Sequence, residues 1–167
     1  MHTDIHDQAQ VELRLWDEIE DGRFGMLGLM GDPHRHFQPM TAFVEPARRE
    51  IWFFTRTDTD LARDVGEGSP AMFVFQAKDQ DVQACIGGEL SVDPDRARIE
   101  KYWNAAVAAW YPDGRDDPRL TMLRLDCSDA QVWISNVGPV RYAWEVARAN
   151  LSKHTPDVGG RASLDLH

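Results

Sequence analysis

The sequence has few of the residues that mark disulfide-rich, metal-binding or nucleic-acid-binding proteins. Its 2 cysteines, Cys85 and Cys127, lie far apart without the CxxC spacing of redox or zinc sites, so buried reduced thiols are expected. Basic residues are also scarce, because 18 Lys and Arg stand against 28 Asp and Glu and give a net charge of -10. This charge repels phosphate backbones and anionic lipid headgroups, which makes nucleic acids and membrane surfaces poor partners.

Long apolar runs and catalytic motifs are missing as well. No stretch approaches the ~20 apolar residues that span a bilayer, and no basic start precedes an apolar run, so a cytoplasmic protein is predicted. We find no supported Ser-His-Asp or Cys-His set, and no helix opens behind the glycines Gly25, Gly28 and Gly31 to form a phosphate loop. His34 and His36 could chelate a metal from one strand face, but no third ligand accompanies them, so no metal site is predicted. Heme binding through either histidine remains a third, weaker hypothesis.

Length and hydrophobic periodicity predict a single mainly β domain with peripheral helices. The 167 residues suit one domain, expected over residues 1–150 and followed by a polar, frayed tail over residues 151–167. Helices are predicted over Gln8–Glu20, within Thr57–Glu67, from Asp93 past Ala106, and over Tyr142–Asn150. Strands are predicted over Phe24–Met30, Phe37–Val44, Ile51–Phe54, Ala71–Phe75, Ala84–Val92, Leu120–Leu125 and Ala130–Ile134.

The many predicted strands and few helices favour an antiparallel barrel over a βαβ sheet, in which strands and helices would alternate. Gly87 and Gly88 interrupt the clearest alternating strand. They predict a bulge or tight bend of the kind that closes a barrel.

Three motifs resemble one family when they are taken together. Trp103 and Trp110 precede a Pro/Gly/Asp turn that ends at Pro118 and leads into an apolar strand, and the segments Gln38–Thr41 and Ile51–Thr55 lie upstream. In this combination the chain, from about Leu13 to Ser135, resembles the general stress protein branch of the pyridoxamine 5'-phosphate oxidase-like flavin-binding split barrels. The resemblance implies an antiparallel split β-barrel, a homodimer with FMN between its subunits, and flavin-dependent oxidation or reduction of a small molecule.

The resemblance implies a strand that runs along the flavin ring, formed here by Gln38, Pro39, Met40 and Thr41. Gln38 stands where the family usually has arginine; its amide can hydrogen-bond a ring carbonyl but brings no charge. A plain core strand with an edge proline is the alternative interpretation of the same residues.

A second implied segment grips the flavin phosphate through hydroxyls and a basic residue. The predicted contacts are Phe54, Thr55, Arg56, Thr57 and Thr59. Leu61 occupies a position where many members carry lysine. Arg56 would therefore have to neutralise the phosphate charge near -2, helped by Arg63 and by backbone N–H groups. A solvated loop arginine is the alternative for Arg56. These departures leave open a weaker FMN site, FAD or a deazaflavin, or no cofactor.

The aromatic residues of the third motif have two interpretations. Trp103, Val107 and Trp110 form an i, i+4, i+7 stripe, which predicts that Trp103 packs in the core. The resemblance implies that Trp110 or Tyr111 covers the flavin ring of the second subunit. A different class of function also stays open: a stress-associated protein of this fold that binds flavin without catalysis, or binds none.

Overall fold

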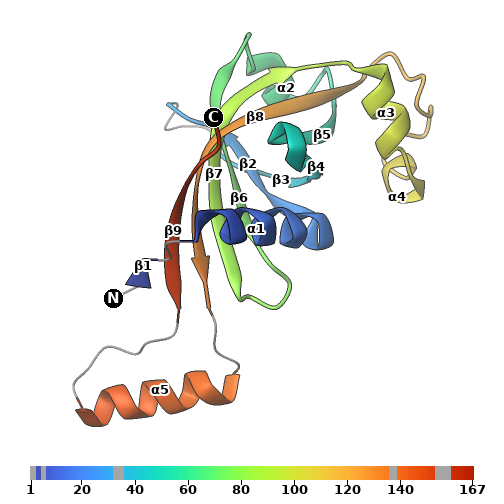
Figure 1. Cartoon of the computed structure of the whole chain (residues 1–167). Helices are drawn as coiled ribbons and strands as arrows, with labels where there is room; N and C mark the ends of the chain where they lie inside the picture. Colours follow the sequence, from blue (N-terminus) through green and yellow to red (C-terminus); the bar gives the residue numbers. More distant parts are fainter. Residues whose placement is uncertain (1–2, 5–6, 32–35, 136–138, 153–158) are drawn as a thin grey trace.

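The computed structural model describes residues 3–4, 7–31, 36–135, 139–152 and 159–167, and its strands form one curled, mainly antiparallel sheet (Figure 1). The strands are β1 (Thr3–Asp4), β2 (Phe24–Leu29), β3 (Gln38–Thr41), β4 (Phe43–Glu45), β5 (Glu50–Arg56), β6 (Ser69–Gln76), β7 (Val82–Val92), β8 (Leu120–Ile134) and β9 (Gly160–Asp165). Their order is β1-β9-β8-β7-β6-β2-β3, with β5 beside β8 and β4 beside β5. The predicted antiparallel split barrel is confirmed.

The split arises at β8, a strand of 15 residues where two shorter strands were predicted. β8 pairs with β7 from Leu123 to Ile134, while its first half also pairs with β5 and its second half with β9. The polar residues between Leu125 and Ala130 suggested a break, but the strand runs through them as it passes from one neighbour to the next.

The predicted bulge in β7 is confirmed, because the register with β8 shifts between Gly87 and Gly88. A Cβ atom at Gly88 would lie 2.2 Å from the carbonyl oxygen of Asp126, so only glycine allows the two backbones to approach so closely.

The main core lies inside the curled sheet and is covered by helix α1 (Gln8–Gly22). Val11, Leu15, Trp16 and Ile19 are buried there, as the helical periodicity predicted. The chain's last strand also contributes to this core.

The expectation of a frayed polar tail is therefore wrong for its final part. Ala162, Leu164 and Leu166 are buried in the main core, and β9 pairs with the second half of β8. These three apolar residues alternate with polar ones at the period of a strand, a signal too short to recognise without its neighbour β8.

A second, smaller core lies on the outer face of β4, β5 and β8 beneath helices α3 (Arg96–Tyr102) and α4 (Ala105–Ala108). One continuous helix was predicted here. The chain instead leaves the helix at Trp103, and the side chain of Asn104 accepts a hydrogen bond from the Val107 N–H to begin α4.

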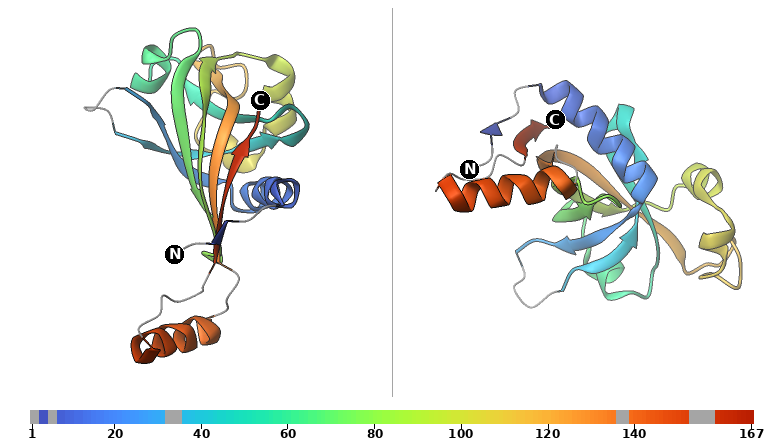
Figure 2. Two further views of the ribbon diagram at one scale, coloured as in Figure 1. Left: turned by 60° about the vertical axis from the view of Figure 1, so that its left-hand side comes forward. Right: turned by 90° about the horizontal axis from the view of Figure 1, so that it is seen from below.

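The remaining helices are short or stand apart from the barrel. Helix α2 (Asp60–Asp64) and the single turn η1 (Pro46–Arg48) connect strands, whereas helix α5 (Pro139–Ser152) lies away from the barrel in both side-on views (Figures 1 and 2). Within the described residues, no helix is long and apolar enough to cross a membrane.

Candidate functional site

The predicted ring-binding residues form β3, whose outer face continues an exposed apolar surface on β2. Pro39 lies opposite Met26 and Thr41 lies opposite Phe24 in the antiparallel register. The Phe24 side chain is 72% exposed, which is unusual for a phenylalanine in a sheet. Met40 turns the other way and packs against the main core.

A shallow hollow of about 310 Å³ begins at Phe24 and Met26 of β2 and extends away from β3. Its lining comes from β2, β6, β7 and β8: Phe24, Gly25, Met26, Val74, Phe75, Gln76, Gln83, Ala84, Cys85 and Trp133. The sequence analysis did not single out this surface. The alternation of Phe24 and Met26 around Gly25 was the available signal, although either face of that strand could have been the buried one.

The predicted phosphate segment lies where β5 ends and α2 begins, and its hydroxyls are engaged within the turn. The Oγ1 atoms of Thr55 and Thr59 lie 3.2 Å apart. The Thr59 hydroxyl also donates to the Arg56 carbonyl at 2.9 Å and accepts from the Ala62 N–H at 3.3 Å, which caps α2. Thr57 is exposed, and its backbone N–H donates to the Arg119 carbonyl at 2.8 Å.

Arg56, the main predicted phosphate contact, is held by a carboxylate of the same turn. Its Nε donates to Asp58 Oδ1 at 2.9 Å and its Nη2 donates to Asp58 Oδ2 at 2.7 Å. These hydrogen bonds lower the pKa of Asp58 from its ordinary value and raise that of Arg56. The bidentate pair keeps both groups charged.

A second guanidinium near Arg56 is paired in the same way. Arg119 donates through Nε and Nη2 to Asp117 at 3.1 and 3.0 Å, and through Nη2 to Asp113 at 3.0 Å. Hydrogen bonds to Asp117 raise the pKa of Arg119, while the nearby positive charge of Arg56 opposes this shift; the charge of Asp117 also acts to raise the pKa of Arg56. This corner of the molecule, formed by Arg56, Asp58, Asp113, Asp117 and Arg119, thus has more carboxylates than guanidiniums.

Phe54, a predicted flavin contact, and Leu61, the residue that replaces the family's lysine, both pack in the hydrophobic cores. Phe54 packs edge-on against Trp103, with ring centroids 6.0 Å apart, within the second core. Leu61, at the usual lysine position, is 6% exposed and packs in the main core.

The aromatic residues of the third motif lie partly in the core and partly on the surface. Trp103 packs in the second core, as predicted. Tyr111 is buried beside it, and burial raises the pKa of its phenol to about 12. Trp110 is 79% exposed and is therefore the aromatic residue of this motif that remains available to a ligand or a second chain.

The fit of these residues to a flavin mononucleotide is uneven. β3 offers an outer face with Pro39 and Thr41 beside an apolar surface, which suits a flat ring. The Arg56 corner does not suit a phosphate dianion as it stands, because its guanidiniums are already neutralised by carboxylates. Thr121, opposite Thr55, has a buried hydroxyl without a hydrogen-bond partner, but it is 2% exposed and out of reach of a ligand at the surface.

The described residues add no support for a metal site or for heme binding. His36 is exposed, and His34 lies outside the described residues. Among the residues that the structure describes, no group of three or more His, Cys, Asp or Glu is placed to hold a metal ion.

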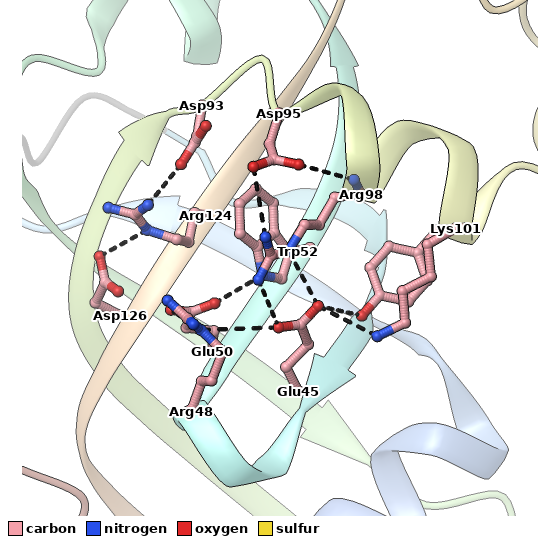
Figure 3. Close-up of polar contacts among 11 residues, drawn as sticks. Glu45, Arg48, Glu50, Trp52, Asp93, Asp95, Arg98, Lys101, Arg124 and Asp126 are labelled. Atoms are coloured by element: carbon pink, nitrogen blue, oxygen red, sulfur yellow. Dashed lines mark hydrogen bonds and ion pairs between the residues drawn. The ribbon is translucent and has the colours of Figure 1, made fainter.

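A polar network that the sequence analysis missed surrounds Trp52 on the outer face (Figure 3). The indole ring lies between the guanidiniums of Arg98 and Arg124, whose carbons are 5.0 and 5.8 Å from the ring centroid. Its Nε1 donates to Glu50 Oε2 at 3.0 Å. Both cations are also paired, Arg98 with Glu45 and Arg124 with Asp93 and Asp126. The network fastens α3 to the sheet.

Glu45 is the most strongly perturbed acid of this network. Burial opposes its ionisation, but hydrogen bonds from Arg98 and Tyr102, with the positive charges of Arg98 and Lys101, lower its pKa to about 2. The Tyr102 hydroxyl donates at 2.9 Å and Arg98 Nη2 at 3.0 Å. Since every charged group here has a partner, the arrangement is that of a stabilising network and not of a poised acid.

The fold is that of the split-barrel proteins, with an apolar outer face beside β3. Comparison with known proteins places the chain in one family of this class. The family model described as pyridoxamine 5'-phosphate oxidase like matches residues 10–157. The chain belongs to this family.

Its relatives are general stress proteins. The chain is 23% identical over 132 residues to general stress protein 26 of Bacillus subtilis (strain 168), covering 75% of this chain and 90% of that protein. A solved structure assigned to general stress protein 26 from Jannaschia sp. CCS1 has a TM-score of 0.79 at 32% identity, over 94% of this chain and 99% of that one. The general stress FMN/FAD binding protein from Xanthomonas citri has a TM-score of 0.72 at 38% identity, over 78% and 92% of the two chains.

Proposed function

We propose that this protein is a homodimeric flavin-binding split barrel that acts as an FMN-dependent oxidoreductase of the general stress protein type. The observation that carries the proposal is the continuity of β3 with the exposed apolar face of β2, which brings Pro39 and Thr41 beside Met26 and Phe24. A flat ring laid along β3 would have an apolar surface beside it. The similarity to the Xanthomonas citri FMN/FAD binding protein supports the same ligand class.

Particular residues of this chain would hold the ring. Pro39 lacks a backbone N–H, so the backbone of β3 offers no donor at this residue. The Gln38 amide can donate to a ring carbonyl. Trp110 is exposed and could cover the ring of a second subunit and exclude water from it. The flavin, when bound, supplies the redox chemistry.

A second copy of this chain is the proposed partner, because large apolar side chains are exposed together along β2. Phe24, Met26 and Met30 all project at 40% exposure or more from β2 or its end. Exposed apolar surfaces of this kind mark interaction sites in soluble proteins.

The flavin proposal is tested by titrating the protein with riboflavin and with FMN and following the ring absorption and fluorescence. We expect binding with a shifted spectrum, and we expect a Thr41→Trp substitution to weaken it by at least about tenfold, because the indole would occupy the outer face of β3. A Ser163→Trp substitution, at an exposed position of β9, serves as the control. A wild-type protein that changes the spectrum of neither flavin would refute the proposal.

The dimer proposal predicts that Phe24→Asp produces a monomer, measured by analytical ultracentrifugation, and exposes Cys85 to thiol reagents. Cys85 lines the hollow beside Phe24, whereas Cys127 is buried and burial raises the pKa of its thiol, so Cys127 stays unreactive in both forms. Leu13→Asp places the same charge at a residue of α1 that is 60% exposed and should leave the dimer intact. A monomeric wild type with a reactive Cys85 would contradict the proposal.

A second candidate function keeps the fold without catalysis: a stress-associated protein that binds flavin loosely or not at all. The pairing of Arg56 with Asp58 favours it, because this pair removes the charge that would anchor a phosphate. The two candidates are separated by mixing the flavin-loaded protein with NADH or NADPH without oxygen. Bleaching of the flavin supports the oxidoreductase, and a flavin that neither donor reduces supports the second candidate.

A further inference from the structure

The Arg56–Asp58 pair lies in the segment that the family resemblance assigns to the flavin phosphate. Both oxygens of Asp58 face Arg56, at 2.7 and 2.9 Å from Nη2 and Nε, which is the fork geometry that a phosphate also uses. The two oxygens of the Asp58 carboxylate thus accept the hydrogen bonds that two oxygens of a bound phosphate would accept. A phosphate can use this fork of Arg56 only when the carboxylate moves away.

The neighbouring cations do not compensate for this pairing. Arg63, on α2, is paired with Asp60, and Arg119 is paired with Asp117 and Asp113. An incoming dianion would therefore meet guanidiniums that already have anionic partners, and it would be repelled by those partners once the pairs opened. Asp58 is 51% exposed and does not cap α2, so its carboxylate can turn away from Arg56 without uncapping the helix.

We propose that Asp58 is a specificity-determining residue that removes the preference of this site for a phosphorylated flavin. The inference rests on the proposed function, since it assumes that the ring is held along β3. The wild-type protein then recognises the flavin through its ring and binds riboflavin and FMN with similar affinity. The family fold is kept, but the phosphate contributes little to binding.

The test compares the riboflavin and FMN affinities of the wild type and of Asp58→Asn by fluorescence titration. We expect the wild-type affinities to agree within about threefold, and the substitution to raise FMN affinity about tenfold, because the released guanidinium of Arg56 can then form charge-assisted hydrogen bonds with the phosphate. Riboflavin affinity should not change. Asp21→Asn, which removes the same charge from a distant carboxylate at the end of α1, should leave both affinities unchanged.

A double-mutant cycle with Arg56→Ala isolates the pair. Once Arg56 is replaced, Asp58→Asn should no longer raise FMN affinity by more than about twofold, because no guanidinium remains to be released. A gain that persists without Arg56 would overturn the proposal and indicate a general charge effect. A wild type that prefers FMN to riboflavin by about a hundredfold would overturn it as well.

Inorganic phosphate provides a test that needs no flavin. The Nε–H signal of Arg56 in an NMR spectrum should respond to phosphate at about tenfold lower concentration in Asp58→Asn than in the wild type. Equal responses would overturn the inference. If neither flavin binds but this difference appears, the proposed function fails, and only the competition between Asp58 and phosphate for Arg56 stands.

Discussion

Replacing Trp52 with alanine is expected to lower the free energy of unfolding by about 3–5 kcal/mol. The side chain is 1% exposed and lies in the second core, so its removal leaves a large cavity that the surrounding strands cannot close. Two guanidiniums lose the ring on which they lie, and the buried Glu50 loses the hydrogen bond from the indole. Urea denaturation followed by circular dichroism measures the effect.

Trp144→Ala is the matched control for this experiment, because it removes the same side chain from a position in α5 that is 67% exposed. We expect a change within about 0.5 kcal/mol. A small effect at Trp52, comparable to that at Trp144, would show that the network in Figure 3 does not hold α3 to the barrel.

Glu45→Gln is expected to destabilise the protein by about 2–3 kcal/mol at neutral pH. The pKa of Glu45 is lowered from 4.5 to about 2, which means that the folded state stabilises the ionised carboxylate more than the unfolded chain does. Glutamine keeps the shape but removes the charge that faces Arg98 and Lys101.

The destabilisation by Glu45→Gln should decrease as the pH falls. Because the folded pKa is the lower one, the contribution of Glu45 is complete above about pH 4.5 and disappears as the pH falls through about 2. The difference between the wild type and Glu45→Gln should thus shrink to less than half its neutral value near pH 3. Glu100→Gln, an exposed acid that pairs with Arg96 and Arg115, should show little effect at any pH. A difference that stays constant from pH 7 to pH 3 would contradict the assignment.

The local pattern of the sequence predicted much of the barrel. Period-two alternation in β7 and helical periodicity in α1 each depend on residues close together in the chain, and both elements formed where predicted. The bulge at Gly87 and Gly88 was also readable, because glycine pairs within a strand have few other uses. The motifs around β3 and Trp103 identified the family for the same reason.

Predictions were wrong where an element depends on a distant partner. β9 forms because Leu164 and Leu166 reach the main core once β8 is in place, and β8 is continuous because β5 and β9 share it. The break between α3 and α4 follows from the Asn104 cap and from packing against the second core, and neither is visible in helical periodicity alone.

The sequence by itself determined the fold class, the family and the scarcity of cations, because composition, periodicity and short motifs are local properties. Only the tertiary structure decided how the charged residues pair. It joined Arg56 to Asp58, and it brought Glu45 of β4 together with Arg98 of α3. It also left the outer face of β2 exposed beside β3, because burial depends on which strands close over a residue and not on the residue itself.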